Sequence, residues 1–169
     1  MQKIRIRLPA TLTNIGPGLN SLGLAVGLYT TVEISQRTDT QLELSFTGEG
    51  VGSYPSSLHH PVMLGMSRFF QRLEKAPLGL TIRVENGIPL ASGLGAEVAF
   101  MVAGVLAAND IMGFPFKRDE AYRIAAQISR ADHAVASLNG GLTAALLEGE
   151  RLHYRQMPVE SMRVAIALD

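Results

Sequence analysis

Residues 9–26 read "PATLTNIGPGLNSLGLAV", and this stretch decides the fold. It concentrates glycine, proline and asparagine between two runs that alternate apolar and polar side chains. The preceding run, "KIRIRL", has the period of two that is typical of a strand with one buried face. Asn14 and Asn20 tolerate left-handed backbone angles. The stretch is therefore either a long turn between strands or a loop whose Asn and Thr side chains line a polar pocket.

Working outward, hydrophobic periodicity predicts further strands and helices along the whole chain. The runs 29–35 and 41–48 are expected to pair as an antiparallel meander. Residues 139–159 read as a hairpin that turns near Glu148–Glu150. Other strands are expected over 78–87 and 162–169, and helices over 60–76, 98–112, 117–129 and 131–138. This order predicts an α+β domain, a mostly antiparallel sheet with helices packed on one face.

Composition narrows the class of protein. The chain has 169 residues, 47 % of them apolar, which suits one globular domain with a real core. A formal net charge of zero argues against nucleic acid as a partner. The absence of cysteine excludes disulfides and thiolate metal sites, and no apolar run approaches the roughly 18–20 residues that span a bilayer. We expect a cytoplasmic protein without a membrane partner.

The stretch 89–100, "PLASGLGAEVAF", follows a predicted strand and opens a predicted helix. A glycine-rich turn of this kind presents backbone N–H groups to anions. It is neither a Walker loop, because no Gly-Lys-Ser/Thr follows, nor the dinucleotide fingerprint. Alone, it is equally well explained by close packing of helix on sheet. Glu97 places a negative charge inside this cradle.

Two polar clusters remain. In "SRADHAVASLNGGL", residues 129–142, Asp132 stands beside His133, a pair that serves acid–base chemistry or merely caps a helix. His59 and His60 are adjacent, and two neighbouring residues rarely converge on one metal. We interpret the two histidines as part of a surface loop.

In their order and spacing, these three segments resemble the N-terminal domain of homoserine kinase, in the GHMP small-molecule kinase superfamily. That family shows Pro-Ala-Thr-x-x-Asn-Leu-Gly-Pro-Gly-Phe-Asp-x-Leu-Gly, then Pro-x-x-x-Gly-Leu-Gly-Ser-Ser-Ala-Ala, then His-Pro-Asp-Asn-Val-Ala before Gly-Gly. The corresponding segments here are "PATLTNIGPGLNSLG", "PLASGLGAEVA" and "RADHAVASLNGG". The resemblance covers nearly all of residues 1–169, as one nucleotide-binding domain with a topology that ribosomal proteins share. It implies that the family's C-terminal domain is absent and that the chain is a fragment.

The resemblance implies an ATP-dependent kinase that phosphorylates the hydroxyl of homoserine or a related alcohol in threonine biosynthesis, with Mg²⁺ nearby. Asp132 would be the catalytic residue. Asn14, Asn20, Asp132 and His133 would bind the substrate. The phosphate loop would consist of Pro89, Leu90, Ala91, Ser92, Gly93, Leu94, Gly95, Ala96 and Glu97.

Several positions depart from the family pattern. The two loop serines are replaced by Ala96 and Glu97, and the substrate-facing Asp by Asn20. Arg130 and His133 replace the His and Asn that flank Asp132, and no carboxylate stands at 127–129, where the family has a metal ligand. Two interpretations of Glu97 stay open. It either holds Mg²⁺ from the loop itself, or it merely caps or decorates the start of a helix that no longer binds nucleotide.

These departures leave two functions. One is a homoserine kinase-like domain with little or no phosphoryl transfer on its own. The other is a degenerate relative that serves as a non-catalytic binding or assembly module. In either case the face that a second domain would cover is expected to be apolar, which favours a homodimer.

Overall fold

The fold is organised around one long strand, β2, which spans Gly18–Arg37. The structure is a computed structural model and describes residues 3–167. Its strands are β1 (Lys3–Ile15), β2, β3 (Leu42–Gly48), β4 (Gly79–Asn86), β5 (Leu142–Glu148) and β6 (Arg151–Met157). Its helices are α1 (Pro61–Leu73), α2 (Ala96–Ile111), α3 (Arg118–Ile128) and α4 (Ala131–Asn139).

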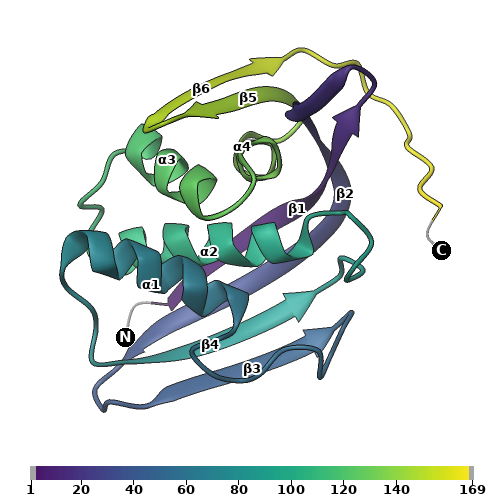
Figure 1. Cartoon of the computed structure of the whole chain (residues 1–169). Helices are drawn as coiled ribbons and strands as arrows, with labels where there is room; N and C mark the ends of the chain where they lie inside the picture. The colour runs from purple at the N-terminus through teal and green to yellow at the C-terminus, as the bar shows by residue number, and fades with distance from the viewer. Residues whose placement is uncertain (1–2, 168–169) are drawn as a thin grey trace.

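The two halves of β2 pair with different strands. Residues 30–37 pair with β4, and residues 22–24 pair with β5, while β1 pairs with β2 from Gly18 to Ser35. In Figure 1 the sheet therefore has a lower arm, β3 and β4, and an upper arm, β5 and β6, joined by β1 and β2. All pairings are antiparallel except that of β3 with β4, which confirms the predicted mostly antiparallel α+β architecture.

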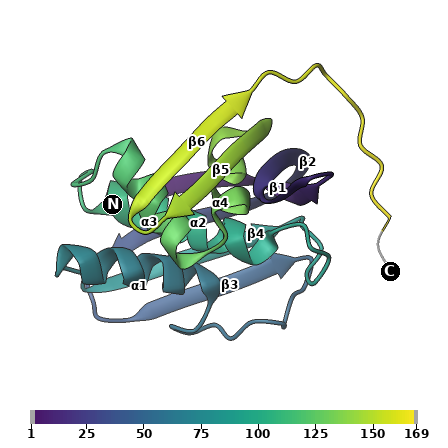
Figure 2. The ribbon, with the colours of Figure 1, turned by 45° about the horizontal axis from the view of Figure 1, so that its top comes forward.

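The four helices lie on one face of this bent sheet. In Figure 2 the upper arm curls over α3 and α4, while α1 and α2 lie against the lower arm. Helix α2 is buried on nearly every side, from Ala99 to Ala108, because it lies at the centre of the core. Within residues 3–167, none of the helices has the length and apolar character needed to cross a membrane.

The predicted meander of 29–35 with 41–48 is wrong. Strand β4 lies between β2 and β3, and it pairs antiparallel with β2 and parallel with β3. The reason is the helix that follows β3: β3, α1 and β4 form a crossover unit, and such a unit joins neighbouring parallel strands. Alternation predicted each strand correctly but carries no information on its partner.

The opening stretch is a β-hairpin rather than a long turn. Strands β1 and β2 stay paired up to Ile15 and Gly18, so only Gly16 and Pro17 form the tip. Asn14 and Asn20 do have the predicted left-handed backbone, with φ of 57° and 51°. The hairpin therefore projects beyond the sheet with an asparagine on each side of its tip.

The predicted last strand is also wrong for the part that the structure describes. Residues 162–167 have no regular secondary structure, and residues 168–169 lie outside the described range. The segment pairs with no strand there, and its alternating apolar side chains, Met162, Val164 and Ile166, line a hollow with residues 24–28 of β2 instead. The alternation of apolar side chains in this segment thus corresponds to contact on one side only.

Candidate nucleotide and acceptor site

The glycine-rich stretch forms a turn between β4 and α2 with free backbone donors. Gly93 and Gly95 have φ of 75° and 72°, and Gly95 is the N-cap of α2 without a side-chain cap. Leu94 anchors the turn, because its side chain is buried and its carbonyl accepts the amide hydrogen of Thr11 at 2.9 Å. Among the described contacts, no acceptor is found for the amides of Gly93, Gly95, Ala96, Glu97 and Val98. A helix start with unpaired N–H groups favours an anion.

A buried imidazole joins this turn to the first hairpin. His133 Nδ1 lies 2.6 Å from Thr11 Oγ1, and His133 Nε2 lies 3.0 Å from Thr13 Oγ1. Thr11 and Thr13 are two residues apart on β1, so both hydroxyls point to the same face. Burial is the main cause that lowers the pKa of His133, which favours the neutral ring. A Cβ on Gly95 would lie 2.5 Å from Thr11 Oγ1 and 2.7 Å from His133 Nδ1.

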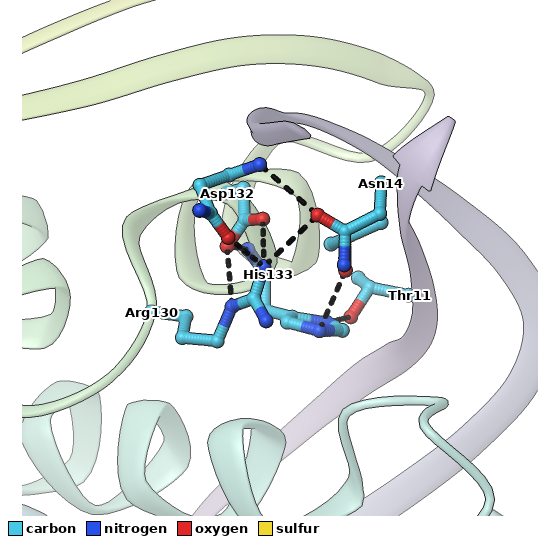
Figure 3. Close-up of polar contacts among 7 residues, drawn as sticks. Thr11, Asn14, Arg130, Asp132 and His133 are labelled. Carbon is cyan, nitrogen blue, oxygen red and sulfur yellow. Dashed lines mark hydrogen bonds and ion pairs between the residues drawn. The ribbon is translucent and has the colours of Figure 1, made fainter. Parts of the chain in front are cut away.

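Arg130 is the centre of a second polar network, drawn in Figure 3. Its Nη2 donates to Asp132 Oδ2 at 2.7 Å and its Nε to Asp132 Oδ1 at 3.2 Å. The same Nη2 reaches Asn20 Oδ1 at 2.9 Å and Asn14 Oδ1 at 3.4 Å. The hydrogen bond with Asp132 raises the pKa of Arg130, so the guanidinium stays charged. Asp132 is 1 % exposed, whereas the Arg130 side chain is 46 % exposed.

Glu97 lies in the first turn of α2 and does not cap it. Glu97 therefore makes no capping hydrogen bond, but it stands in the first turn, where the helix dipole favours a carboxylate, so both interpretations of Glu97 stay predictions. Its Oε1 accepts a hydrogen bond from the hydroxyl of Tyr54 at 2.7 Å. Burial, and then this bond, raise the pKa of Tyr54, which keeps its hydroxyl protonated.

The site offers a magnesium ion one protein carboxylate. Over residues 3–167 there is no group of three or more His, Cys, Asp or Glu side chains suited to a metal. Mg²⁺ commonly takes one or two carboxylates and completes its shell with phosphate oxygens and water. Glu97 beside the unpaired amides fits that donor set, and Asp132 does not, because Arg130 occupies both of its oxygens.

These parts border a single cleft of about 550 Å³. Its lining includes Arg130, His133, Tyr54 and Ser53. Residues 89–98, which include the whole predicted phosphate loop, form its floor. The structure thus brings the loop and His133 together, with Asp132, Asn14 and Asn20 held behind Arg130.

His60 does not belong to a surface loop, as the sequence suggested. It is fully buried, and its Nδ1 caps α1 by accepting the amide hydrogen of Val62 at 3.2 Å. Its ring packs among the rings of Phe46, Tyr54 and Phe100, with centroids 5.4–5.7 Å away. Burial lowers the pKa of His60 to about 4. His59, its neighbour, is exposed.

Comparison with known proteins agrees with this geometry. The family model described as "GHMP kinases N terminal domain" matches residues 62–149, more than half of the chain. The chain belongs to the GHMP kinase family. The matched range includes the glycine-rich turn, α2 and the segment from Arg130 to His133. Most residues that line the cleft of this GHMP kinase domain therefore lie within the part that matches the family model.

The relatives of this GHMP kinase domain include homoserine kinases. It is 30 % identical to homoserine kinase of Carboxydothermus hydrogenoformans over 164 residues, 96 % of this chain and 54 % of that protein. It is 34 % identical to the homoserine kinase of Caldanaerobacter subterraneus over 158 residues, 93 % of this chain and 50 % of that protein. The chain thus spans about half the length of these relatives.

Solved structures show the same fold. The crystal structure of homoserine kinase from Cytophaga hutchinsonii superposes with a TM-score of 0.79 at 24 % identity, over 93 % of this chain and 52 % of that one. Methanococcus jannaschii mevalonate kinase superposes with a TM-score of 0.72 at 13 % identity, over 94 % of this chain and 57 % of that one. The GHMP architecture therefore persists at identities too low to carry function.

Sequence analysis assigned no individual role to four participants. Thr11 and Thr13 stand in the opening motif, and their spacing of two on a strand was the available signal. Arg130 was noticed only as a departure from the family, although a guanidinium two residues before a carboxylate is a common ion pair. Tyr54 had no signal, because its contact with Glu97 spans 43 positions.

Proposed function

We propose that this GHMP kinase domain is the nucleotide-binding part of a small-molecule kinase related to homoserine kinase. The observation that carries the proposal is the set of unpaired amides of Gly93 and of residues 95–98, which line the cleft. They would receive the phosphates of ATP, as helix starts bind anions in general. The homoserine kinase relatives support this assignment over other nucleotide-binding proteins.

Glu97 would hold Mg²⁺ beside the phosphates, and the ion would offset the repulsion between Glu97 and a triphosphate. The acceptor would lie on the side of Arg130 and the two asparagines. In the transfer, its hydroxyl oxygen bonds to the γ-phosphorus, the bond from that phosphorus to the bridging oxygen breaks to leave ADP, and the proton passes to solvent. Asp132 is paired with Arg130, so we assign it a positioning role in place of the predicted catalytic one.

A titration of the chain with ATP, with and without Mg²⁺, tests the proposal by calorimetry. We expect Mg²⁺-dependent binding that Glu97→Gln weakens at least tenfold, whereas Glu148→Gln at the exposed end of β5 leaves it unchanged. In a coupled assay with homoserine, the chain is expected to show little or no turnover, because Arg130 holds both oxygens of Asp132 and the acceptor hydroxyl must lose its proton to solvent without a general base.

One observation favours the second candidate, a non-catalytic binding or assembly module. Glu97 stands where the family pattern has a serine, and the carboxylate on the acceptor side, Asp132, is paired with Arg130 through both of its oxygens. For such a module, ATP would produce no heat with or without Mg²⁺. Steady phosphorylation of homoserine would instead rule the module out.

A further inference from the structure

The guanidinium of Arg130 binds the side-chain oxygens of three residues that lie beside the cleft. It binds both carboxylate oxygens of Asp132 and the side-chain oxygens of Asn14 and Asn20. Asp132 Oδ1 also accepts the amide hydrogen of His133 at 2.9 Å, and Asn14 Oδ1 that of Asn20 at 3.0 Å. These oxygens are therefore satisfied from within the chain.

This arrangement is unsuited to a ligand ammonium group. An ammonium has three donors and no acceptor, so it needs free oxygens, preferably of a carboxylate. Here it would meet oxygens that are already bonded, beside a fixed positive charge that repels it. Displacing Arg130 would also leave a carboxylate that is 1 % exposed, Asp132, without its counter-ion, which is costly.

The same arrangement is well suited to an anionic group. Nη1 of Arg130 has no partner among residues 3–167, and the side chain is 46 % exposed and lines the cleft with the glycine-rich turn. Its other nitrogens hold the guanidinium plane in place through Asp132, so its orientation is fixed before a ligand arrives. Guanidinium N–H groups bind carboxylates strongly and with defined geometry.

We propose that the acceptor alcohol of this site carries a carboxylate that binds Arg130 and carries no ammonium, so that it is a hydroxy acid rather than an amino acid. The inference rests on the proposed function, because the alcohol is the acceptor of the phosphoryl group of the bound nucleotide. Arg130 is the residue that selects it, and Asp132 positions Arg130.

Calorimetric titration of the unmodified chain with three small alcohols tests the proposal. The probes are 4-hydroxybutanoate, which has the carboxylate alone, L-homoserine, which has both groups, and L-homoserinol, which has the ammonium alone. We expect 4-hydroxybutanoate to bind at least tenfold more tightly than L-homoserine, and L-homoserinol not to bind. Equal or tighter binding of L-homoserine, or no binding of 4-hydroxybutanoate, overturns the proposal.

Two variants test whether Arg130 is the residue that selects the carboxylate of the alcohol. The double variant Arg130→Gln/Asp132→Asn removes both charges together, and we expect it to bind 4-hydroxybutanoate at least tenfold more weakly. Arg155→Gln, on the exposed face of β6, is the matched control and should bind as the unmodified chain does. Unchanged affinity in a folded double variant, checked by circular dichroism, contradicts the role of Arg130. If the double variant does not fold, the three alcohols still decide the proposal on the unmodified chain.

A parallel titration with Mg²⁺ and ATP separates this inference from the proposed function. ATP binding without a preference for 4-hydroxybutanoate would overturn the inference and leave the kinase assignment standing. A preference for 4-hydroxybutanoate without ATP binding would contradict the kinase assignment, and Arg130 would remain the carboxylate site of a binding module.

Discussion

Thr11 Oγ1 and His133 Nδ1 lie 2.6 Å apart, although 122 positions separate the two residues along the chain. Both side chains are buried, and Gly95 passes so close that any side chain there would collide with them. One hydrogen bond thus joins the first hairpin, the glycine-rich turn and the start of α4. The three motifs that define the site in the sequence meet at this point.

Removing the hydroxyl of Thr11 should therefore destabilise the protein. Thr11→Val leaves the buried Nδ1 of His133 without a partner, which costs about 1–3 kcal/mol of unfolding free energy. Thr13→Val is the matched control, because Thr13 is only partly buried and water can replace its hydroxyl at Nε2. Urea unfolding measures both. Equal losses in the two variants would show that burial of the bond is unimportant.

The two glycines of the turn should respond differently to alanine. Gly93→Ala meets no atom within 4 Å, so it bears only the cost of a left-handed alanine, about 1–2 kcal/mol. Gly95→Ala adds a collision with Thr11 and His133, and we expect it to lose at least about 1 kcal/mol more. Thermal or urea unfolding of the two variants side by side checks this order, which equal stabilities would refute.

The contact between α1 and α2 depends on small residues. A Cβ on Gly104 would collide with the carbonyl oxygen of Val62 on α1. Alanine gains about 1 kcal/mol in helix propensity, but overpacking against a backbone atom costs about 1–3 kcal/mol. We expect Gly104→Ala to be destabilising on balance, while Gly27→Ala, with open space around it, is nearly neutral. A higher melting temperature for Gly104→Ala would contradict this packing.

His60 should make the stability of the fold depend on pH. Its pKa is lowered from 6.5 to about 4 in the folded state, so between these values the unfolded chain binds more protons. Its contribution is fully present above pH 6.5 and falls as the pH drops toward 4, by about 3 kcal/mol in total.

The variant His60→Asn isolates this contribution, because asparagine still caps α1 but does not titrate. Urea unfolding at pH 7 and pH 4.5 should show a larger loss for the unmodified chain than for His60→Asn. Equal losses in the two proteins would mean that His60 is protonated in the folded state without penalty.

The sequence predicted where most strands and helices lie better than it predicted which strands pair with each other. Local alternation is enough to recognise β3 and β4, but which strands pair depends on the crossover through α1, and that is a property of chain topology. The final run 162–167 shows the converse, because its alternation is real and yet no strand pairs with it. His60 was misjudged because its burial depends on Phe46, Tyr54 and Phe100, which are distant in sequence.

The sequence predicted those parts of the site whose residues are close together along the chain. The turn Gly93–Gly95 and its free amides follow from a strand, glycines and a helix in succession. The pairing of Asp132 with Arg130 was within reach, since the two residues are only two positions apart. The convergence of Asn14 and Asn20 on the same guanidinium was not, because more than 100 positions lie between.

Strand β2 has a mechanical consequence for the whole molecule. Because both arms pair with this one strand, neither arm can detach without exposing backbone groups of β2. We infer that the protein melts as a single cooperative unit. Amide hydrogens of Val32 beside β4 and of Leu24 beside β5 should then exchange with the solvent at comparable rates, although they lie in different halves of β2.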